Sequence, residues 1–242
     1  MVNPQGSIQI VGVRSGKNTR ALKGMDDIVQ DFQSEGIFTS YAKIDAADFI
    51  TSLKTSAAVM KSSFFKPNIL FAPIENRTKD ELQQIIDISA ENKFGVTFMA
   101  KHAESGLGRG RYVNVWMRDQ SPNWKLSFDM ANIDLPLLIS LMLMKNWRIN
   151  LRLICVVDNQ KWQEDARNYL SDLLVLARMP KGYRIIVEHS KFDKYLETAP
   201  HADLNIFGLA KKADKSMMEN LVQQTDSTCM FVMDSGFESV LV

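Results

Sequence analysis

"LPLLISLMLMK", from Leu135 to Lys145, is the most apolar stretch of the chain and decides what kind of protein this is. A helix that crosses a bilayer needs about 20 apolar residues, because the hydrocarbon core is about 30 Å thick. The run from Leu135 to Met144 is far shorter and lies between Asp134 and Lys145. We therefore predict a helix buried inside a globular domain, with Asp134 as its cap and Pro136 in its first turn, where a missing N–H is harmless.

Short apolar runs alternate with longer amphipathic stretches on both sides of this helix. Strands that are apolar on both faces and alternate with helices are typical of a mostly parallel sheet covered by helices. The predicted fold is therefore α/β, with a mostly parallel sheet flanked by helices. The predicted strands are residues 7–13, 37–45, 68–73, 95–101, 112–119, 151–158, 183–189, 203–209 and 228–234, and the predicted helices are residues 22–32, 46–64, 79–89, 134–147, 160–178, 191–196 and 214–224.

The helix that follows Thr78 has the clearest local signal in the first part of the chain. Thr78 and Glu81 have the spacing of a capping box, in which the hydroxyl accepts the third backbone amide and the carboxylate reaches back. Leu82, Ile85 and Ile86 then fall on one face of the helix. This pattern predicts an amphipathic helix that covers the sheet.

Two segments of the chain repeat the same order of elements. Asn68–Ala100 and Leu204–Asp234 each read as a strand, a polar loop, a capped helix and a second strand. Few identities support the repeat, so common descent is only suggested. We predict two similar βα halves, residues 1–102 and 112–242, joined by a linker loop at residues 103–111.

Composition places the chain among ordinary globular proteins. Of its 242 residues, 45% are hydrophobic and 24% are charged, which allows a substantial core. The 29 basic and 28 acidic residues give a net charge of +1, without the electrostatic signature of a nucleic-acid partner. Cys155 and Cys229 lie in apolar runs and are expected to be buried free thiols in a reducing setting. The N-terminus does not have the pattern of a signal peptide.

Two glycine-containing stretches are candidates for anion binding. A phosphate loop places glycines between a strand and the N-terminus of a helix, where amides converge on the anion. "GLGRGR", Gly106 to Arg111, instead precedes a strand, so a flexible linker is favoured, with an anion or lipid contact by Arg109 and Arg111 as the alternative. "VGVRSGKNTR", Val11 to Arg20, lacks the dinucleotide-binding spacing, so a simple connecting loop is favoured.

The sequence shows no pattern of an enzyme or a metal site. The histidines have neither a second ligand at helical spacing nor a candidate nucleophile beside them. The aspartates that end predicted strands are expected to cap the helices that follow. The histidines are His102, His189 and His201, and the aspartates are Asp45, Asp119, Asp158 and Asp234. We therefore predict a protein without catalytic residues, cofactor or metal.

Two consecutive segments of the second half follow a distinctive order. "VNVWMRD", Val113 to Asp119, is an aromatic strand that ends in aspartate, and "LPLLISLMLMKNWRINLRLICVV", Leu135 to Val157, is a leucine-rich helix followed by a strand. This order resembles the cytosolic C-terminal domain of the cation-chloride cotransporters. "KPNILFAP" and the closing "TDSTCMFVMDSGFESVLV" resemble other parts of that domain. The chain's length and the absence of a regulatory serine/threonine tract resemble a prokaryotic member.

The resemblance implies a fold, a location and partners. The family's domain is similar to two universal stress protein units side by side, which agrees with the two predicted halves. It lies on the cytoplasmic side of the cell membrane, attached to a transmembrane domain that carries out the transport of Na or K with Cl, and it pairs as a homodimer. We therefore expect a regulatory and dimerisation domain that has no membrane span of its own.

The chain departs from related patterns in two places. The family's glycine pair after Asp119 is absent, so we expect a longer turn or a short hairpin using Trp124–Asp129. The G-x-x-G-x9-G-[ST] pattern of ATP-binding stress proteins is missing from Pro73–Asn92 and from Gly208–Asn220. Nucleotide binding is therefore not carried over, and a freestanding nucleotide-binding protein of the universal stress type is the alternative function.

The end of the chain is rich in apolar residues, which suggests an association surface. The candidate dimer contacts are Met217, Met218, Leu221 and Phe237. A two-fold dimer would use the same patch on both copies. The competing interpretation is that these side chains cover the last strands of the sheet.

Overall fold

The computed structural model describes residues 6–14, 24–46, 48–126 and 132–241. Every predicted strand and helix is present, with ends that differ by a few residues. The strands are β1 (Ser7–Arg14), β2 (Phe38–Asp45), β3 (Ile69–Pro73), β4 (Gly95–Ala100), β5 (Tyr112–Met117), β6 (Asn150–Val157), β7 (Tyr183–His189), β8 (Leu204–Gly208) and β9 (Thr228–Met233). The helices are α1 (Met25–Ser34), α2 (Phe49–Lys61), α3 (Lys79–Asn92), α4 (Asp134–Trp147), η2 (Gln160–Trp162), α5 (Gln163–Leu176), α6 (Phe192–Leu196) and α7 (Lys215–Thr225).

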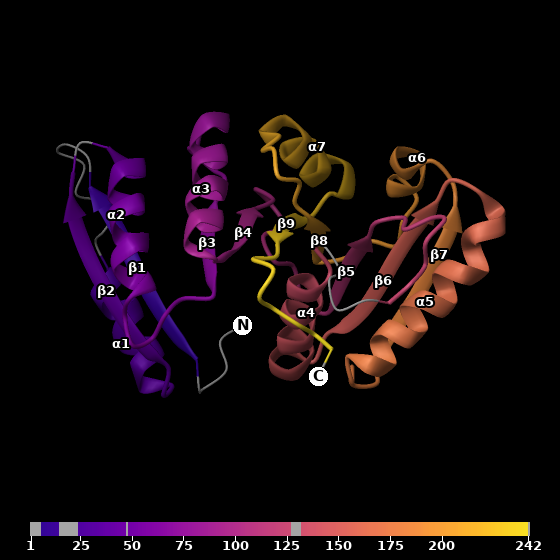
Figure 1. Ribbon diagram of the computed structural model, residues 1–242, viewed down its shortest axis with the longest axis horizontal. Helices are drawn as coiled ribbons and strands as arrows, with labels where there is room; N and C mark the ends of the chain where they lie inside the picture. The colour runs from indigo at the N-terminus through magenta and orange to yellow at the C-terminus, as the bar shows by residue number, and fades with distance from the viewer. Residues whose placement is uncertain (1–5, 15–23, 47, 127–131, 242) are drawn as a thin grey trace.

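The larger sheet of the described residues has seven strands in the order β3-β4-β9-β8-β5-β6-β7. Neighbouring strands are parallel except β4 and β9, which are antiparallel. Helices α4 and α5 pack on one face, and α3, α6 and α7 pack on the other (Figure 1). The predicted α/β fold with a mostly parallel sheet flanked by helices is confirmed.

The sequence repeat forms a local two-fold arrangement in the middle of this sheet. The segments β3-α3-β4 and β8-α7-β9 each consist of a parallel strand pair with a crossover helix. They meet where β4 and β9 run antiparallel, with Phe98 opposite Phe231. Both rings are completely buried. The two repeated segments therefore share one core instead of forming separate ones.

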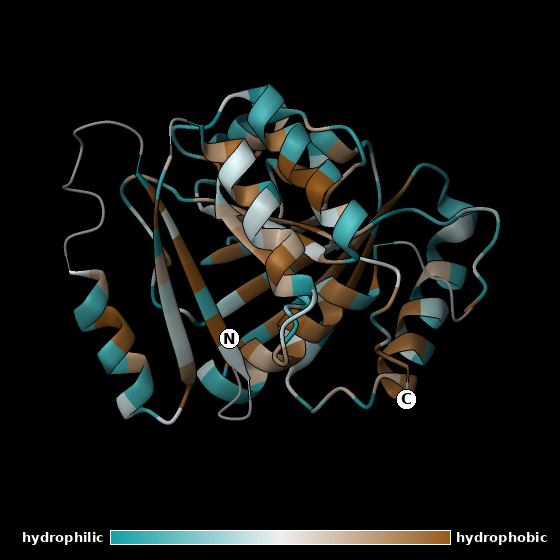
Figure 2. Ribbon diagram, turned by 60° about the vertical axis from the view of Figure 1, so that its left-hand side comes forward, coloured by the Kyte–Doolittle hydropathy of each residue, from teal (hydrophilic) through white to brown (hydrophobic). Residues whose placement is uncertain are grey.

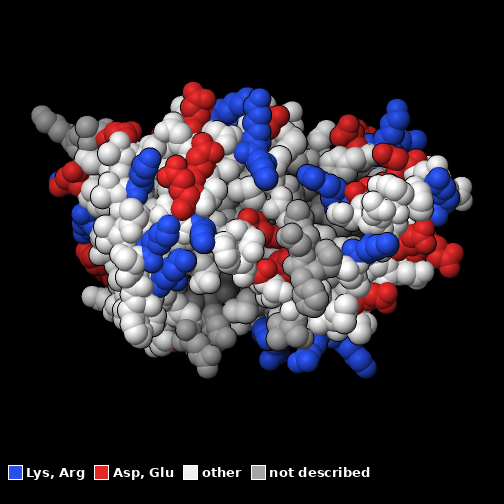
Figure 3. Space-filling view, viewed as in Figure 1, with Lys and Arg blue, Asp and Glu red and all other residues white. Residues whose placement is uncertain are grey.

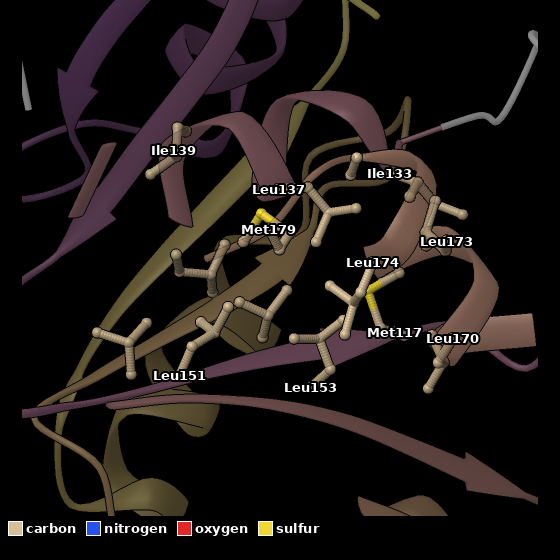
Figure 4. Close-up of a cluster of buried hydrophobic side chains, with 14 of the residues drawn as sticks. Met117, Ile133, Leu137, Ile139, Leu151, Leu153, Leu170, Leu173, Leu174 and Met179 are labelled. Carbon is tan, nitrogen blue, oxygen red and sulfur yellow. The ribbon is translucent and has the colours of Figure 1, made fainter. Parts of the chain in front are cut away.

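Helix α4 is buried against the sheet, as its composition predicts. Leu137 and Leu143 have no exposed surface, and Ser140 satisfies its buried hydroxyl by donating to Pro136 O at 2.7 Å. The helix packs with α5 over the strands of the second half (Figure 4). No helix within the described residues is both long and apolar enough to cross a membrane. The apolar stretch from Leu135 to Met144 is therefore part of the core.

The cap of α4 differs from the prediction. Asp134 is the first residue of the helix, and its side chain makes no cap. The carboxylate of Asp234 accepts the amides of Asp134 and Leu135 instead, at 3.2 and 3.1 Å. An acidic side chain at this position also interacts favourably with the helix dipole. The cap comes from about 100 residues away along the chain, which no local pattern shows.

The first two strands stand apart from the larger sheet. β1 and β2 form a parallel pair of their own, and neither is hydrogen-bonded to β3. Figure 2 shows α1 beside this pair at the edge of the molecule. Of the residues of α1, all of which are described, none is buried. The first half therefore contributes its strands to two sheets, whereas the strands of the second half all belong to one.

Two further predictions can be compared with the described residues. The capping box is present, since Glu81 N donates to Thr78 Oγ1 at 3.1 Å and Thr78 N donates to Glu81 Oε2 at 2.7 Å. After Asp119 the chain makes a turn without strand pairing as far as residue 126, so the short hairpin is absent from the described part of that segment. Residues 127–129 of the predicted hairpin lie outside the described residues.

Candidate functional site

The glycine-rich stretch before β5 is folded around one carboxylate. Asp203 accepts the amides of Arg109, Arg111 and Tyr112, each at 2.9 Å. Burial alone would raise the pKa of Asp203, but these amide hydrogen bonds outweigh burial, and the pKa lies below its ordinary value. The stretch is thus an anchored loop, whereas the sequence favoured a flexible linker.

Glycine is required at the centre of this loop. Gly108 has φ +52°, and a Cβ added there would lie 2.1 Å from Asp203 Oδ1. Any side chain would push the carboxylate away from the amides that it binds. Gly108 therefore serves the close approach of Asp203.

The side chains of Arg109 and Arg111 point to solvent at the surface of this loop. Within the described residues neither guanidinium forms a hydrogen bond or an ion pair. Their backbone amides are already bound to Asp203, so only the guanidinium groups could meet an anion or a lipid. The predicted anion or lipid contact therefore stays a prediction.

His102 lies beside Ser105 and Asp226, a group of side chains that the sequence did not predict. Its Nδ1 accepts the amide of Ser105 at 3.1 Å and lies 2.9 Å from Ser105 Oγ. Its Nε2 lies 3.2 Å from Asp226 Oδ1. The sequence shows Ser105 three residues away but cannot show Asp226, which arrives through the pairing of β4 with β9.

Ser105, His102 and Asp226 follow the order Ser-His-Asp in space, which is the order of a hydrolase triad. Such a site needs backbone amides that point to the oxyanion near the serine. The amide of Gly106 is bound to His102 O, and the amide of Gly108 is bound to Ser105 O. Because these amides close the turn, the arrangement serves to fasten the loop to the end of α7.

A small cavity of about 190 Å³ lies beside this region. Its floor holds the buried amides of Asn114 and Asn205, and the Trp116 Nε1–H donates to Asn205 Oδ1 at 2.9 Å. His201, which lines the cavity, is held by Arg152, whose guanidinium donates to His201 O at 2.8 Å. Both asparagines lie near the amino ends of their strands, whereas α/β sheets bind nucleotides beyond the carboxyl ends. The cavity is therefore not placed like a nucleotide site.

The aspartates at strand ends have structural partners. Asp45 pairs with Arg14 at 2.5 Å, and this hydrogen bond lowers the pKa of Asp45. Asp119 accepts the amides of Ser121 and Asp158, at 2.8 and 3.3 Å. Together with the cap by Asp234, these contacts give three of the four aspartates structural partners. The prediction that they cap the helices that follow is wrong for Asp45 and Asp158, because Asp48 caps α2 and Asn159 caps η2. Residues 15–20 of the loop before α1 lie outside the described residues.

Two models of one family match the chain along nearly its whole length. The prokaryotic cation-chloride cotransporter C-terminal domain, first part, matches residues 1–107, and its second part matches residues 108–241. The crystal structure of the cytoplasmic domain of a prokaryotic cation chloride cotransporter is similar, with 31% identity and a TM-score of 0.87. The match covers 98% of this chain and 88% of that one. The chain belongs to the prokaryotic cation-chloride cotransporter C-terminal domain family.

The fold of this cotransporter domain is shared with universal stress proteins. The universal stress protein from Archaeoglobus fulgidus DSM 4304 matches with 12% identity and a TM-score of 0.54, over 93% of this chain and 85% of that one. At that identity the likeness shows the fold alone. A search of curated proteins gives no match. The recognised family is confirmed, and a freestanding nucleotide-binding protein is not favoured.

The predicted dimer contacts of the cotransporter domain do not form one surface. Met218 and Leu221 are core residues, 0% and 6% exposed, whereas Met217 and Phe237 are 40% and 69% exposed. Met218 belongs to the core on the side of α7, while the tail that carries Phe237 packs with Val240 on the side of α4. Met218 and Leu221 are therefore removed from the candidate contacts, and the four residues cannot act as a single patch.

The last residues of the cotransporter domain are held by a group of carboxylates. Val240 N donates to Asp134 Oδ1 at 2.6 Å, and Ser235 N and Oγ donate to Glu238 Oε2. Burial, with Asp134 and Glu238 nearby, raises the pKa of Asp234 to about 6. Burial also raises the pKa of Asp134. Both raised pKa values favour the protonated carboxyl groups at this end of the sheet.

Reactive groups are scarce among the described residues. No group of three or more potential ligands there is arranged to hold a metal ion. Cys155 and Cys229 are both completely buried, and burial raises the pKa of each thiol to about 12. Acidic and basic side chains are mixed over the face drawn in Figure 3.

Proposed function

We propose that this chain is a non-catalytic regulatory and dimerisation domain that works beneath the membrane part of a cation-chloride cotransporter. Family membership supports its position on the cytoplasmic side and its own transmembrane domain as a partner. The observation that best supports dimerisation is the uncovered apolar face of β3, at the edge of the larger sheet.

Alternate side chains of β3 point to opposite faces of the sheet. Leu70 and Ala72 pack with the core beneath α3. Ile69 and Phe71 point the other way and are 39% and 48% exposed. In the second half the corresponding face is covered by α4. A second copy related by a two-fold axis would cover these side chains and would also shield an open strand edge.

Such a contact can be weak and still act in the complete transporter. Two domains attached to a paired membrane part experience a local concentration of roughly millimolar. The isolated domain is then expected to be largely monomeric when dilute and to associate as its concentration rises. Pairing that depends on the state of the domain would give the cytoplasmic side a means of regulating transport.

Sedimentation over a range of concentrations tests the proposal. The mass should rise from 27.5 kDa toward twice that value. Phe71→Ser should weaken association by about tenfold, because an apolar contact at the centre of an interface is lost. Val175→Ser, at an apolar position of α5 that is 67% exposed, is the control and should leave association unchanged. A monomer at millimolar concentration would overturn dimerisation.

Two further measurements address regulation and the alternative function. Chloride flux through the complete transporter carrying Phe71→Ser should differ from that of the parent if pairing regulates transport. Equal flux at equal expression would contradict a regulatory role of this contact.

Calorimetry with ATP, ADP and AMP should show no heat of binding, and micromolar affinity for any of them would favour the nucleotide-binding alternative.

A further inference from the structure

Three phenylalanine rings gather on the surface of the first half. Phe38 begins β2, while Phe64 and Phe65 lie in the loop between α2 and β3. The ring of Phe65 lies 4.9 Å from that of Phe38 and 5.0 Å from that of Phe64. Phe38, Phe64 and Phe65 are 53%, 95% and 46% exposed. Single exposed apolar residues are common, but a contiguous aromatic cluster marks a contact surface.

The loop that carries this aromatic cluster is held firmly at its base. The hydroxyls of Ser62 and Ser63 each donate to a carbonyl of the last turn of α2 at 2.8 Å. Gln9 Nε2, from β1, donates to Phe65 O at 2.9 Å. These bonds fix the backbone before and after Phe64. The ring of Phe64 therefore projects from an anchored loop instead of being exposed by a loose one.

Lysines flank the aromatic cluster on both sides. Lys61 ends α2 and Lys66 follows Phe65, and both side chains are exposed. Lys61 Nζ donates to Glu91 O at 3.3 Å, whereas Lys66 forms no hydrogen bond or ion pair within the described residues. Aromatic rings at the level of the headgroups, with lysines reaching lipid phosphates, are typical of protein surfaces that rest on a membrane.

The aromatic cluster lies where the chain enters the domain. Ser7, the first residue of β1, is aligned with Phe38 across the β1–β2 pair. Figure 1 shows that this pair occupies one end of the molecule. The matched family is described as the C-terminal domain of the cotransporter, so the membrane part precedes it in the family. The start of β1 is therefore the point that is nearest along the chain to the membrane.

We propose that the aromatic cluster rests on the cytoplasmic leaflet, with Phe64 in the headgroup region and Lys66 among anionic phosphates. A lipid surface fits better than a protein pocket, because Phe64 protrudes from a narrow loop and fluid headgroups need no matching cavity. The contact would limit how the domain can turn beneath the membrane part. The proposal uses the family membership of the chain and does not depend on dimerisation.

A probe attached at the tip of the loop tests this contact. Phe64→Cys is labelled with an environment-sensitive fluorophore, since Cys155 and Cys229 are completely buried and remain unlabelled. The chain is displayed through an N-terminal histidine tag on vesicles of phosphatidylcholine, phosphatidylglycerol and a little nickel-chelating lipid. The tether supplies roughly millimolar local concentration, so a weak contact is populated. The fluorescence should shift to the blue and increase by about twofold relative to a control carrying the label at Val175→Cys.

Three comparisons decide the outcome. Lys66→Glu in the labelled chain should reduce the change by about half or more, since one favourable charge becomes unfavourable. Equal spectra at positions 64 and 175, or a blue shift that Lys66→Glu leaves unaltered, would overturn the proposal. If position 64 instead becomes protected only in the complete transporter, the aromatic cluster contacts the membrane protein and not the lipid. Sedimentation of Phe64→Ser without vesicles separates this contact from dimerisation, because the proposal expects its association to match that of the parent.

Discussion

The two halves of this molecule use the same order of strands and helices with different results. In the second half, α4 and α5 cover one face of the sheet and α6 and α7 cover the other, and the central strands β5, β8 and β9 are almost entirely buried. In the first half, β1 and β2 form a separate pair, and none of the described residues of α1 is buried. The difference shows that the strand-helix pattern alone decides neither which strands join one sheet nor which faces of the sheet are covered.

The side chains of the two halves explain this difference. Helix α4 is apolar nearly all round, so it gains free energy only by being buried on most sides. Helix α1 has an apolar stripe, but Ile28 on it remains 44% exposed. The strands near α1 therefore keep apolar surface that a partner or a membrane can use. We expect the second half to provide the stability and the first half to provide the contacts.

The largest expected effect comes from a cavity beneath α4. Leu143→Ala should lower the free energy of unfolding by about 2–5 kcal/mol, because a completely buried leucine leaves a void that the core cannot fill. Ile28→Ala in α1 should change it by no more than about 0.5 kcal/mol. Urea unfolding of the two variants measures both values. Equal losses would show that the first half is as tightly packed as the second.

Two glycines with positive φ allow the cost of an added side chain to be compared between the two halves. Gly24→Ala, before α1, should cost about 1–2 kcal/mol from backbone strain alone, since nothing lies within 4 Å of an added Cβ. Gly108→Ala should cost about 2–4 kcal/mol, because Asp203 must also give up its amide hydrogen bonds. Thermal unfolding of both variants compares the costs. If Asp203→Ala abolishes the extra loss at Gly108, the carboxylate is its cause.

The smallest effect expected on stability depends on pH and is confined to the second half. The pKa of Asp234 is raised to about 6, so the folded chain binds this proton before the unfolded chain does. The free energy of unfolding should therefore rise as pH falls from 7 through about 6, and level off near the ordinary pKa of about 4. Because the side chain is partly exposed, the gain should be roughly 1–2 kcal/mol.

Asp234→Asn is the matched variant for this pH dependence. It no longer titrates and keeps one oxygen, which can accept one of the two amides that the two carboxylate oxygens of Asp234 accept in the parent. Urea unfolding of the variant between pH 7 and 5 should show a smaller slope than that of the parent. The remaining slope belongs to Asp134, whose pKa is also raised. A variant that keeps the full slope would assign the proton uptake to other groups.

Local sequence signals predicted the parts of the fold that depend on neighbours in the chain. The capping box of Thr78 and Glu81, the burial of the 135–144 helix and the burial of both cysteines all follow from short patterns. The candidate sites were less predictable. Asp203, Asp226 and Asp234 reach partners about 90 to 120 residues away in sequence, so no local spacing could show them.

The sequence by itself determined the α/β class, the order of the elements and the family, because these depend on periodicity and on recognisable segments. Only the tertiary structure decided which apolar residues are core and which are surface. Met218 and Met217 are adjacent in the chain, yet one is completely buried and the other is 40% exposed. The packing of α4 covers the second half, and the separate position of the β1–β2 pair leaves Phe38 and Phe71 uncovered. Where an element is apolar on one side only, the burial of a single residue depends on how the other elements are arranged, so the local sequence does not decide it.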